Sequence, residues 1–222
     1  MNDYLPCIEI EPTAEASASI IWLHGLGADG RDFEGIVPEL HLPEDLAVRF
    51  IFPNAPALPI TINNGYVMPA WFDILALGGE GERSINPHQL LASAVQVHKL
   101  IDREIERGVS SERIILAGFS QGGAVNYHAG LTYDKPLGGI LALSTFFPTA
   151  ESVTPHPASH GLPIQIFHGQ QDPILNVCMA KNSIKYLNSL GFHPDYKEYA
   201  MEHSVCPEEI RDIAVWIKSI LI

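Results

Sequence analysis

A serine flanked by glycines follows a short apolar run in the sequence. Gly118, Ser120 and Gly122 have the spacing G-x-S-x-G, after the apolar residues 113–118 and before a helix predicted to start near Gln121. At such a strand-to-helix turn the serine takes a strained backbone conformation, and a side chain at either glycine would collide with neighbouring elements. The turn would project the hydroxyl and aim backbone N–H groups at a developing oxyanion. The pattern predicts a nucleophile, with a serine in a glycine-rich packing turn as the alternative.

A serine hydroxyl becomes a nucleophile when a histidine takes its proton and a carboxylate orients that histidine. In this context the chain order is Ser, then Asp or Glu, then His. Among the later histidines, only His203 lies between the last predicted strand and the last predicted helix. Asp172 follows the predicted strand 163–168, at the sheet edge where Ser120 emerges. We therefore expect a triad of Ser120, His203 and Asp172, although an Asp before Pro173 is also typical of a turn.

A glycine-rich loop near the N-terminus predicts the rest of the site. The stretch WLHGLGADG, residues 22–30, reads as a strand ending in a tight loop. Such a loop can supply a second oxyanion N–H group, and Leu26 is the most plausible donor. A phosphate-binding loop is the alternative, but the stretch lacks both the G-x-G-x-x-G spacing and the Walker lysine.

Short apolar runs alternating with amphipathic segments predict the elements that position these residues. Strands are expected within the runs 19–25, 47–56, 113–120, 137–147, 163–172 and 195–204, and helices at 86–108, 178–191 and 206–221. Strands that alternate with helices favour an α/β fold, with a mostly parallel central sheet flanked by helices. We expect one domain over residues 1–222. Residues 57–86, rich in Gly, Pro and Asn with weak periodicity, are expected to form an active-site flap or loop.

Composition excludes several classes of partner. The net charge of −13 argues against nucleic acid and against a polybasic membrane site. The three cysteines are far apart, which makes a disulfide framework or a zinc site unlikely, and no metal or cofactor is expected. The N-terminus lacks a signal-peptide pattern, and no apolar run approaches the roughly 20 residues of a membrane span. These features favour a cytoplasmic protein without a transmembrane segment.

Five motifs in order resemble the phospholipase/carboxylesterase family, which includes acyl-protein thioesterases. They are LHGLGADGRDF, NAPALPITINNGYVMPAWFDI, GFSQGGAV, HGQQDPILNV and HSVCPEEI, and the resemblance spans about residues 18–221. The sequence looks more similar to the bacterial carboxylesterase branch. The resemblance implies an α/β-hydrolase fold without a large cap domain. It implies that Ser120, Asp172 and His203 are catalytic, that the N–H groups of Leu26 and Gln121 form the oxyanion hole, and that Trp71 lies near the acyl pocket.

The substrate is expected to be a short- to medium-chain carboxylic ester, hydrolysed through an acyl-enzyme intermediate. An acyl-protein thioesterase or lysophospholipase acting on longer acyl chains is the alternative. Phe72, Met68 and Trp71 can line an acyl slot or belong to the core. A non-catalytic hydrolase-fold binding protein would lack a triad member, and a dienelactone-hydrolase-like enzyme would carry cysteine at position 120. A monomer or weak homodimer is expected.

One residue departs from the family pattern. Similar proteins commonly carry glycine immediately before the catalytic histidine, whereas this chain has Glu202. A carboxylate there either raises the pKa of the neighbouring imidazole or points to solvent. The pH optimum and the access of the leaving group depend on which of these holds.

Overall fold

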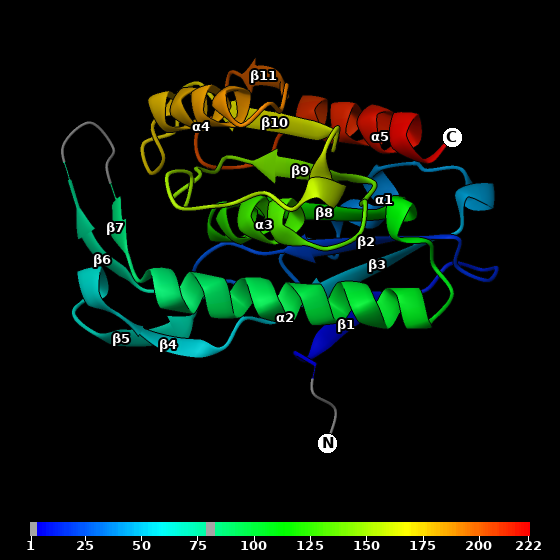
Figure 1. Cartoon of the computed structure of the whole chain (residues 1–222), viewed down its shortest axis with the longest axis horizontal. Coiled ribbons are helices and arrows are strands. Elements are labelled where there is room, and N and C mark those ends of the chain that lie inside the picture. The colour runs from blue at the N-terminus through cyan, green and yellow to red at the C-terminus, as the bar shows by residue number, and fades with distance from the viewer. Residues whose placement is uncertain (1–3, 79–82) are drawn as a thin grey trace.

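The centre of the computed structural model, which describes residues 4–78 and 83–222, is a seven-stranded sheet (Figure 1). Its strand order is β1-β3-β2-β8-β9-β10-β11, and only β1 runs antiparallel to its neighbour. The strands are β1 (Cys7–Ile10), β2 (Ala18–Leu23), β3 (Val48–Pro53), β8 (Ile114–Phe119), β9 (Gly139–Leu143), β10 (Ile164–Gly169) and β11 (Asp195–Tyr199). The expected mostly parallel sheet is confirmed.

Helices cover both faces of this sheet. They are α1 (Ile36–Glu39), α2 (Pro87–Glu106), α3 (Gln121–Thr132), α4 (Val177–Ser189) and α5 (Pro207–Leu221). In Figure 1, α2 and α3 lie in front of the sheet. The three longer predicted helices are confirmed, and α2 and α5 each begin with proline in the first turn. Within the described residues, no large cap domain covers the sheet.

Two hydrophobic cores follow from the alternation of side chains along the strands. Ile21 and Leu116 face α2, α3 and α4, whereas their neighbours Ile20 and Ile115 face α1 and α5. Because both faces are covered, β2 and β3 are buried along their whole length. Burial on both faces therefore explains the continuous apolar runs in the sequence.

The segment 57–86 differs from the expected irregular loop. It forms two antiparallel hairpins, β4 (Ala57–Ile60) with β5 (Tyr66–Pro69), and β6 (Ile74–Leu77) with β7 (Arg83–Ile85). Both hairpins lie at the left end of the molecule in Figure 1. Positions 79–82 of the expected flap lie outside the described residues. None of the helices in the described part of the chain combines the length and apolar character needed to cross a bilayer.

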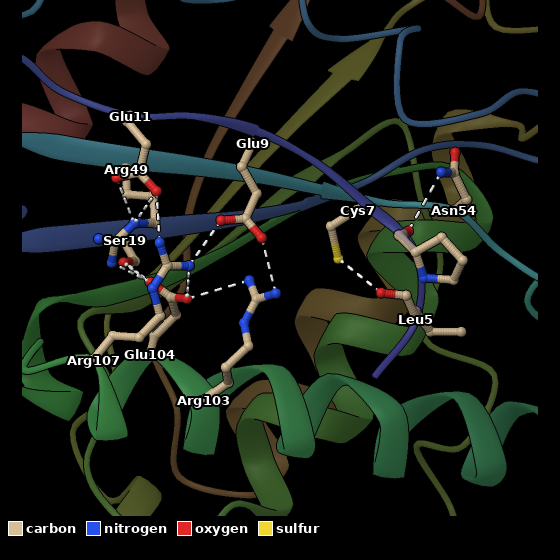
Figure 2. A network of polar contacts seen from close by, with 11 residues as sticks. Leu5, Cys7, Glu9, Glu11, Ser19, Arg49, Asn54, Arg103, Glu104 and Arg107 are labelled. Atoms are coloured by element: carbon tan, nitrogen blue, oxygen red, sulfur yellow. Dashed lines mark hydrogen bonds and ion pairs between the residues drawn. The ribbon is translucent and has the colours of Figure 1, made fainter. Parts of the chain in front are cut away.

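A network of charged side chains fastens β1 and β3 to α2 (Figure 2). Glu104 is fully buried, and its carboxylate accepts hydrogen bonds from Ser19 Oγ at 2.7 Å and Arg49 Nη1 at 2.8 Å. Arg107 joins Glu104 to Glu9 of β1 at 3.0 and 2.7 Å. Burial raises the pKa of Glu104, but the hydrogen bonds and nearby arginines outweigh burial and hold that pKa below its usual range. The network therefore keeps a buried carboxylate ionised and joins β1, β2 and β3 to the end of α2.

Candidate active site

Ser120 occupies a strained turn between β8 and α3. Its φ of 53° and ψ of −118° lie outside the regions that side-chain-bearing residues normally adopt. Two hydrogen bonds hold this backbone: Ser120 N–H donates to Leu143 O at 2.9 Å, and Thr145 Oγ1 donates to Ser120 O at 2.6 Å. The last residue of β9 and the segment after it therefore stabilise the conformation that projects the serine hydroxyl.

The flanking glycines are required by close backbone approach. A Cβ at Gly118 would lie 2.6 Å from the carbonyl carbon of Gly122. A Cβ at Gly122 would lie 2.4 Å from the carbonyl oxygen of Leu23 on β2. Real side chains do not tolerate these separations, so the turn packs tightly only with glycine at both positions. The collision expected from the sequence is therefore confirmed.

The structure brings His203 between Ser120 and Asp172. His203 Nε2 lies 3.1 Å from Ser120 Oγ, and His203 Nδ1 lies 2.6 Å from Asp172 Oδ2. The other oxygen, Asp172 Oδ1, accepts the N–H groups of Ile174 at 2.8 Å and Leu175 at 2.7 Å. Burial raises the pKa of Asp172, but the hydrogen bonds from His203 and the two backbone donors outweigh burial and lower it. The carboxylate is thus held ionised against the imidazole.

The loops that carry Asp172 and His203 are bonded to each other. Gln170 N–H donates to Tyr199 O at 2.8 Å, and Gln171 N–H donates to Met201 O at 3.1 Å. A Cβ at Gly169 would lie 2.3 Å from the carbonyl oxygen of Glu202, so the two loops are in direct contact. The ring of Phe119 packs on the ring of His203, with centroids 4.7 Å apart. These contacts fix the separation of the imidazole from the carboxylate.

The loop containing Leu26 is organised by a buried histidine. Burial lowers the pKa of His24, and its neutral ring bonds Gly25 O through Nδ1 at 2.7 Å. His24 Nε2 accepts the N–H of Ala55 at 3.1 Å. In the part of the chain that the structure describes, neither the Leu26 nor the Gln121 backbone N–H donates a hydrogen bond. Both groups are therefore available to a substrate oxygen.

A pocket of about 230 Å³ adjoins Ser120 and His203. Its apolar lining comprises Leu26, Ile74, Phe119, Phe146, Ile174 and Leu175. Arg83 of β7 also lines it, so the second hairpin contributes both Ile74 and Arg83. Arg83 and Phe146 belong to none of the five motifs, and Ile174 lies in the motif HGQQDPILNV without any feature that marks it as a pocket residue. Within the described residues, no cluster of three or more His, Cys, Asp or Glu side chains is arranged to hold a metal ion.

The three residues expected near the acyl group do not line the pocket beside Ser120. Trp71 and Phe72 are fully buried in the core, and neither lines the catalytic pocket. Trp71 instead donates from Nε1 to His24 O at 2.8 Å. Met68 is half-buried beside the oxyanion loop, where its sulfur would lie 3.6 Å from a Cβ at Gly27, and it does not line the pocket either. The burial of Trp71 and Phe72 favours the alternative that they belong to the core, and a role of the three residues in binding substrate stays a prediction.

Glu202 is exposed, although it immediately precedes His203. Its backbone oxygen accepts the N–H of Ser204 at 3.0 Å. Of the two alternatives for this carboxylate, the structure favours a side chain directed to solvent.

Comparison with known proteins identifies the family of this chain. The signature of the phospholipase/carboxylesterase family matches residues 6–221. The chain belongs to this family. It is a serine hydrolase with the α/β-hydrolase fold that the five motifs predict.

Individual relatives agree with this assignment. An acyl-protein thioesterase 1 from Gibberella zeae is 38% identical over 214 residues, which covers 92% of this chain and 91% of the relative. The crystal structure of Arabidopsis thaliana SOBER1 superposes with a TM-score of 0.86 at 32% identity, covering 92% of this chain and 99% of that one. A Bacillus cereus carboxylesterase has a TM-score of 0.80 at 16% identity, covering 99% and 96% of the two chains. That level of identity shows the fold alone and does not support a particular likeness to the bacterial branch.

Proposed function

We propose that this serine hydrolase is an acyl-protein thioesterase, with Ser120 as nucleophile, His203 as general base and Asp172 as the orienting acid. The main support for this chemistry is a continuous series of hydrogen bonds from Asp172 Oδ2 through His203 to Ser120 Oγ, with separations of 2.6 and 3.1 Å. The names of relatives such as the Gibberella zeae protein favour thioesters over the short-chain carboxylic esters expected from the sequence. The alternative in the sequence analysis thus becomes the main proposal.

The reaction follows from the positions of these atoms. His203 Nε2 takes the hydroxyl proton while Ser120 Oγ forms a bond to the carbonyl carbon of the thioester. The N–H groups of Leu26 and Gln121 bind the oxyanion that develops on the carbonyl oxygen. As the carbon–sulfur bond breaks, the His203 imidazolium gives its proton to the leaving thiolate.

Deacylation reverses these roles. His203 Nε2 takes a proton from water, whose oxygen attacks the acyl carbon of the ester with Ser120. When the second tetrahedral intermediate collapses, the proton returns to Ser120 Oγ and a carboxylic acid leaves. Asp172 stays ionised throughout and stabilises the imidazolium in both halves.

A pair of serine variants tests the nucleophile. We expect Ser120→Ala to lower kcat by at least about 10³-fold and to abolish labelling by a fluorophosphonate. The exposed Ser110, replaced by alanine in the control, should leave both readouts at the wild-type level. Labelling that persists in Ser120→Ala would remove Ser120 from the proposal. A wild-type protein that hydrolyses no ester or thioester would instead support the non-catalytic binding protein.

A substrate series tests the thioester preference. The substrates are S-butyryl, S-octanoyl and S-palmitoyl thioesters of N-acetylcysteamine, together with the corresponding p-nitrophenyl esters. We expect kcat/KM to be higher for the longer acyl thioesters than for p-nitrophenyl butyrate. If the butyrate ester is the better substrate, the protein is a short-chain carboxylesterase and the proposed thioesterase activity is wrong.

We further propose a cytoplasmic protein that works as a monomer or weak homodimer. Cys7, Cys178 and Cys206 are free thiols, and Cys178 is exposed, which suits a reducing compartment. Size-exclusion chromatography with light scattering, across a range of protein concentrations, measures the oligomeric state.

A further inference from the structure

Arg83 contributes a cation to the pocket beside Ser120 and His203, whose lining is largely apolar but also includes Asp32 and Gln121. It is the one lysine or arginine among the described residues that line this pocket with Ser120 and His203. Arg83 is half-buried at the start of β7, and its Nη2 donates a hydrogen bond to Ile174 O across the pocket. Its Nε is buried and has no hydrogen-bond partner within the described part of the chain. The guanidinium therefore has unused donors at the site of reaction.

In the part of the chain that the structure describes, Asp32 lines the same pocket but no carboxylate neutralises the charge of Arg83. No Asp or Glu of the described residues lies within ion-pair distance of it. Asp172 attracts it at longer range, but the carboxylate oxygens of Asp172 already accept from His203, Ile174 and Leu175. Burial lowers the pKa of Arg83, yet a guanidinium keeps its charge at neutral pH. A half-buried unpaired cation is costly unless it has a ligand.

We propose that Arg83 binds an anionic group of the substrate, a carboxylate or a phosphate placed close to the thioester. This inference rests on the proposed function, because it names the class of thioester that the same pocket selects. The planar guanidinium suits either oxyanion group through parallel N–H donors. The long-range field does not provide such selection, since the chain carries a net charge of −13. Selectivity for an anion would have to come from a local contact such as Arg83.

The anionic group can belong to the leaving thiol or to the acyl chain, and two substrate pairs distinguish these sources. For the thiol, S-butyryl-3-mercaptopropionate is compared with its methyl ester, which is neutral and nearly the same size. For the acyl chain, the S-methyl thioester of adipic acid is compared with the form whose distal carboxylate is methylated. We expect one pair to show a preference of about tenfold or more in kcat/KM for the free carboxylate. This preference should shrink at high ionic strength.

Variants assign that preference to Arg83. Arg83→Gln should reduce this preference, the ratio of kcat/KM on the charged substrate to kcat/KM on the neutral one, to about twofold or less, chiefly by lowering kcat/KM on the charged substrate. Arg83→Lys should retain part of the preference, because it keeps the charge and loses the planar donors. Arg211→Gln on the exposed side of α5 removes the same charge away from the pocket and should change nothing.

Three outcomes would overturn the inference. One is a wild-type enzyme without preference for either carboxylate. Another is an equal loss on charged and neutral substrates in Arg83→Gln, which would mean that Arg83 acts only through its bond to Ile174. The third is a loss of preference in Arg211→Gln, which would indicate a long-range charge effect. Because hydrolysis of the neutral thioesters is measured in every experiment, failure of the proposed thioesterase activity is seen separately.

Discussion

The side-chain amide of Gln121 forms hydrogen bonds with the backbone of Trp71 and of Phe72. Gln121 Oε1 accepts the N–H of Trp71 at 3.0 Å, and Gln121 Nε2 donates to Phe72 O at 2.8 Å. Trp71 in turn bonds His24 O, two residues before Leu26. The two segments proposed to form the oxyanion hole are therefore connected through one buried indole, and Gln121 supplies both a backbone donor and this support.

Replacing Gln121 by glutamate tests this support. The carboxylate keeps the size of the side chain and can still accept from Trp71 N–H, but it places an acceptor against Phe72 O. We expect kcat to fall by about 10- to 100-fold with KM changed by less than about threefold, because a lost buried donor displaces the oxyanion groups. Steady-state kinetics on one thioester measures this. Gln96→Glu on α2 is the control, because no hydrogen bond between described residues involves the Gln96 amide. An equal loss in both variants, or a change in KM alone, would contradict the role of Gln121.

The residues proposed to be catalytic could be brought together from the sequence because each follows the end of a strand in a fixed chain order. Ser120 follows β8, Asp172 follows β10 and His203 follows β11, so parallel strands bring them to one edge of the sheet. Arg83 could not be predicted in this way. It reaches the pocket from a hairpin outside the main sheet, where no periodicity or motif marks it.

The fold was predictable where burial on both faces produces continuous apolar runs. The hairpins of 57–86 gave no such signal, because their strands are three or four residues long and partly exposed. The four-residue strand β1 was missed for the same reason, since it is half-buried at the sheet edge. Trp71 and Phe72 show a further limit of sequence-based prediction. An apolar pair gives the same sequence pattern whether it lines a pocket or packs behind one.

Gly122→Ala is expected to destabilise the fold. Its added methyl group would lie 2.4 Å from Leu23 O, so the turn that carries Ser120 must separate from β2. We expect a loss of about 2–4 kcal/mol in the free energy of unfolding, together with loss of activity. Gly35→Ala is the control, because nothing lies within 4 Å of its Cβ position and its φ is −67°. That variant should be unchanged or slightly more stable. Urea denaturation measures both, and equal stabilities would refute the close approach at Gly122.

Glu104→Ala should destabilise the protein without changing catalysis. Removing this buried carboxylate leaves Arg49, whose side chain is 9% exposed, without its closest buried partner. We expect a loss of about 3–5 kcal/mol in the free energy of unfolding, the effect of breaking a buried ion pair. Glu11→Ala removes a carboxylate that is 50% exposed and should cost less than about 1 kcal/mol. Thermal denaturation and kcat/KM are measured for both variants. A similar small effect in the two would show that burial of Glu104 contributes little.

Glu209 is predicted to make stability depend on pH. It is fully buried in the first turn of α5, and its oxygens have no hydrogen-bond partner within the described residues. Burial raises its pKa to about 8, and the nearby Cys206 N–H offsets only part of this effect. The unfolded chain loses this proton near pH 4.5, while the folded chain keeps it until about pH 8. The free energy of unfolding should therefore fall as pH rises between these values and level off above pH 8.

Glu209→Gln removes this titration while keeping the size of the side chain. From pH 5 to pH 8.5 the wild type should lose stability relative to the variant, by on the order of 4 kcal/mol. Urea denaturation at half-unit pH intervals gives the two curves. Glu208→Gln alters the exposed neighbouring carboxylate and should follow the wild type. Parallel curves for wild type and Glu209→Gln would mean that Glu209 ionises normally in the folded protein, through water or a backbone shift that relieves its burial.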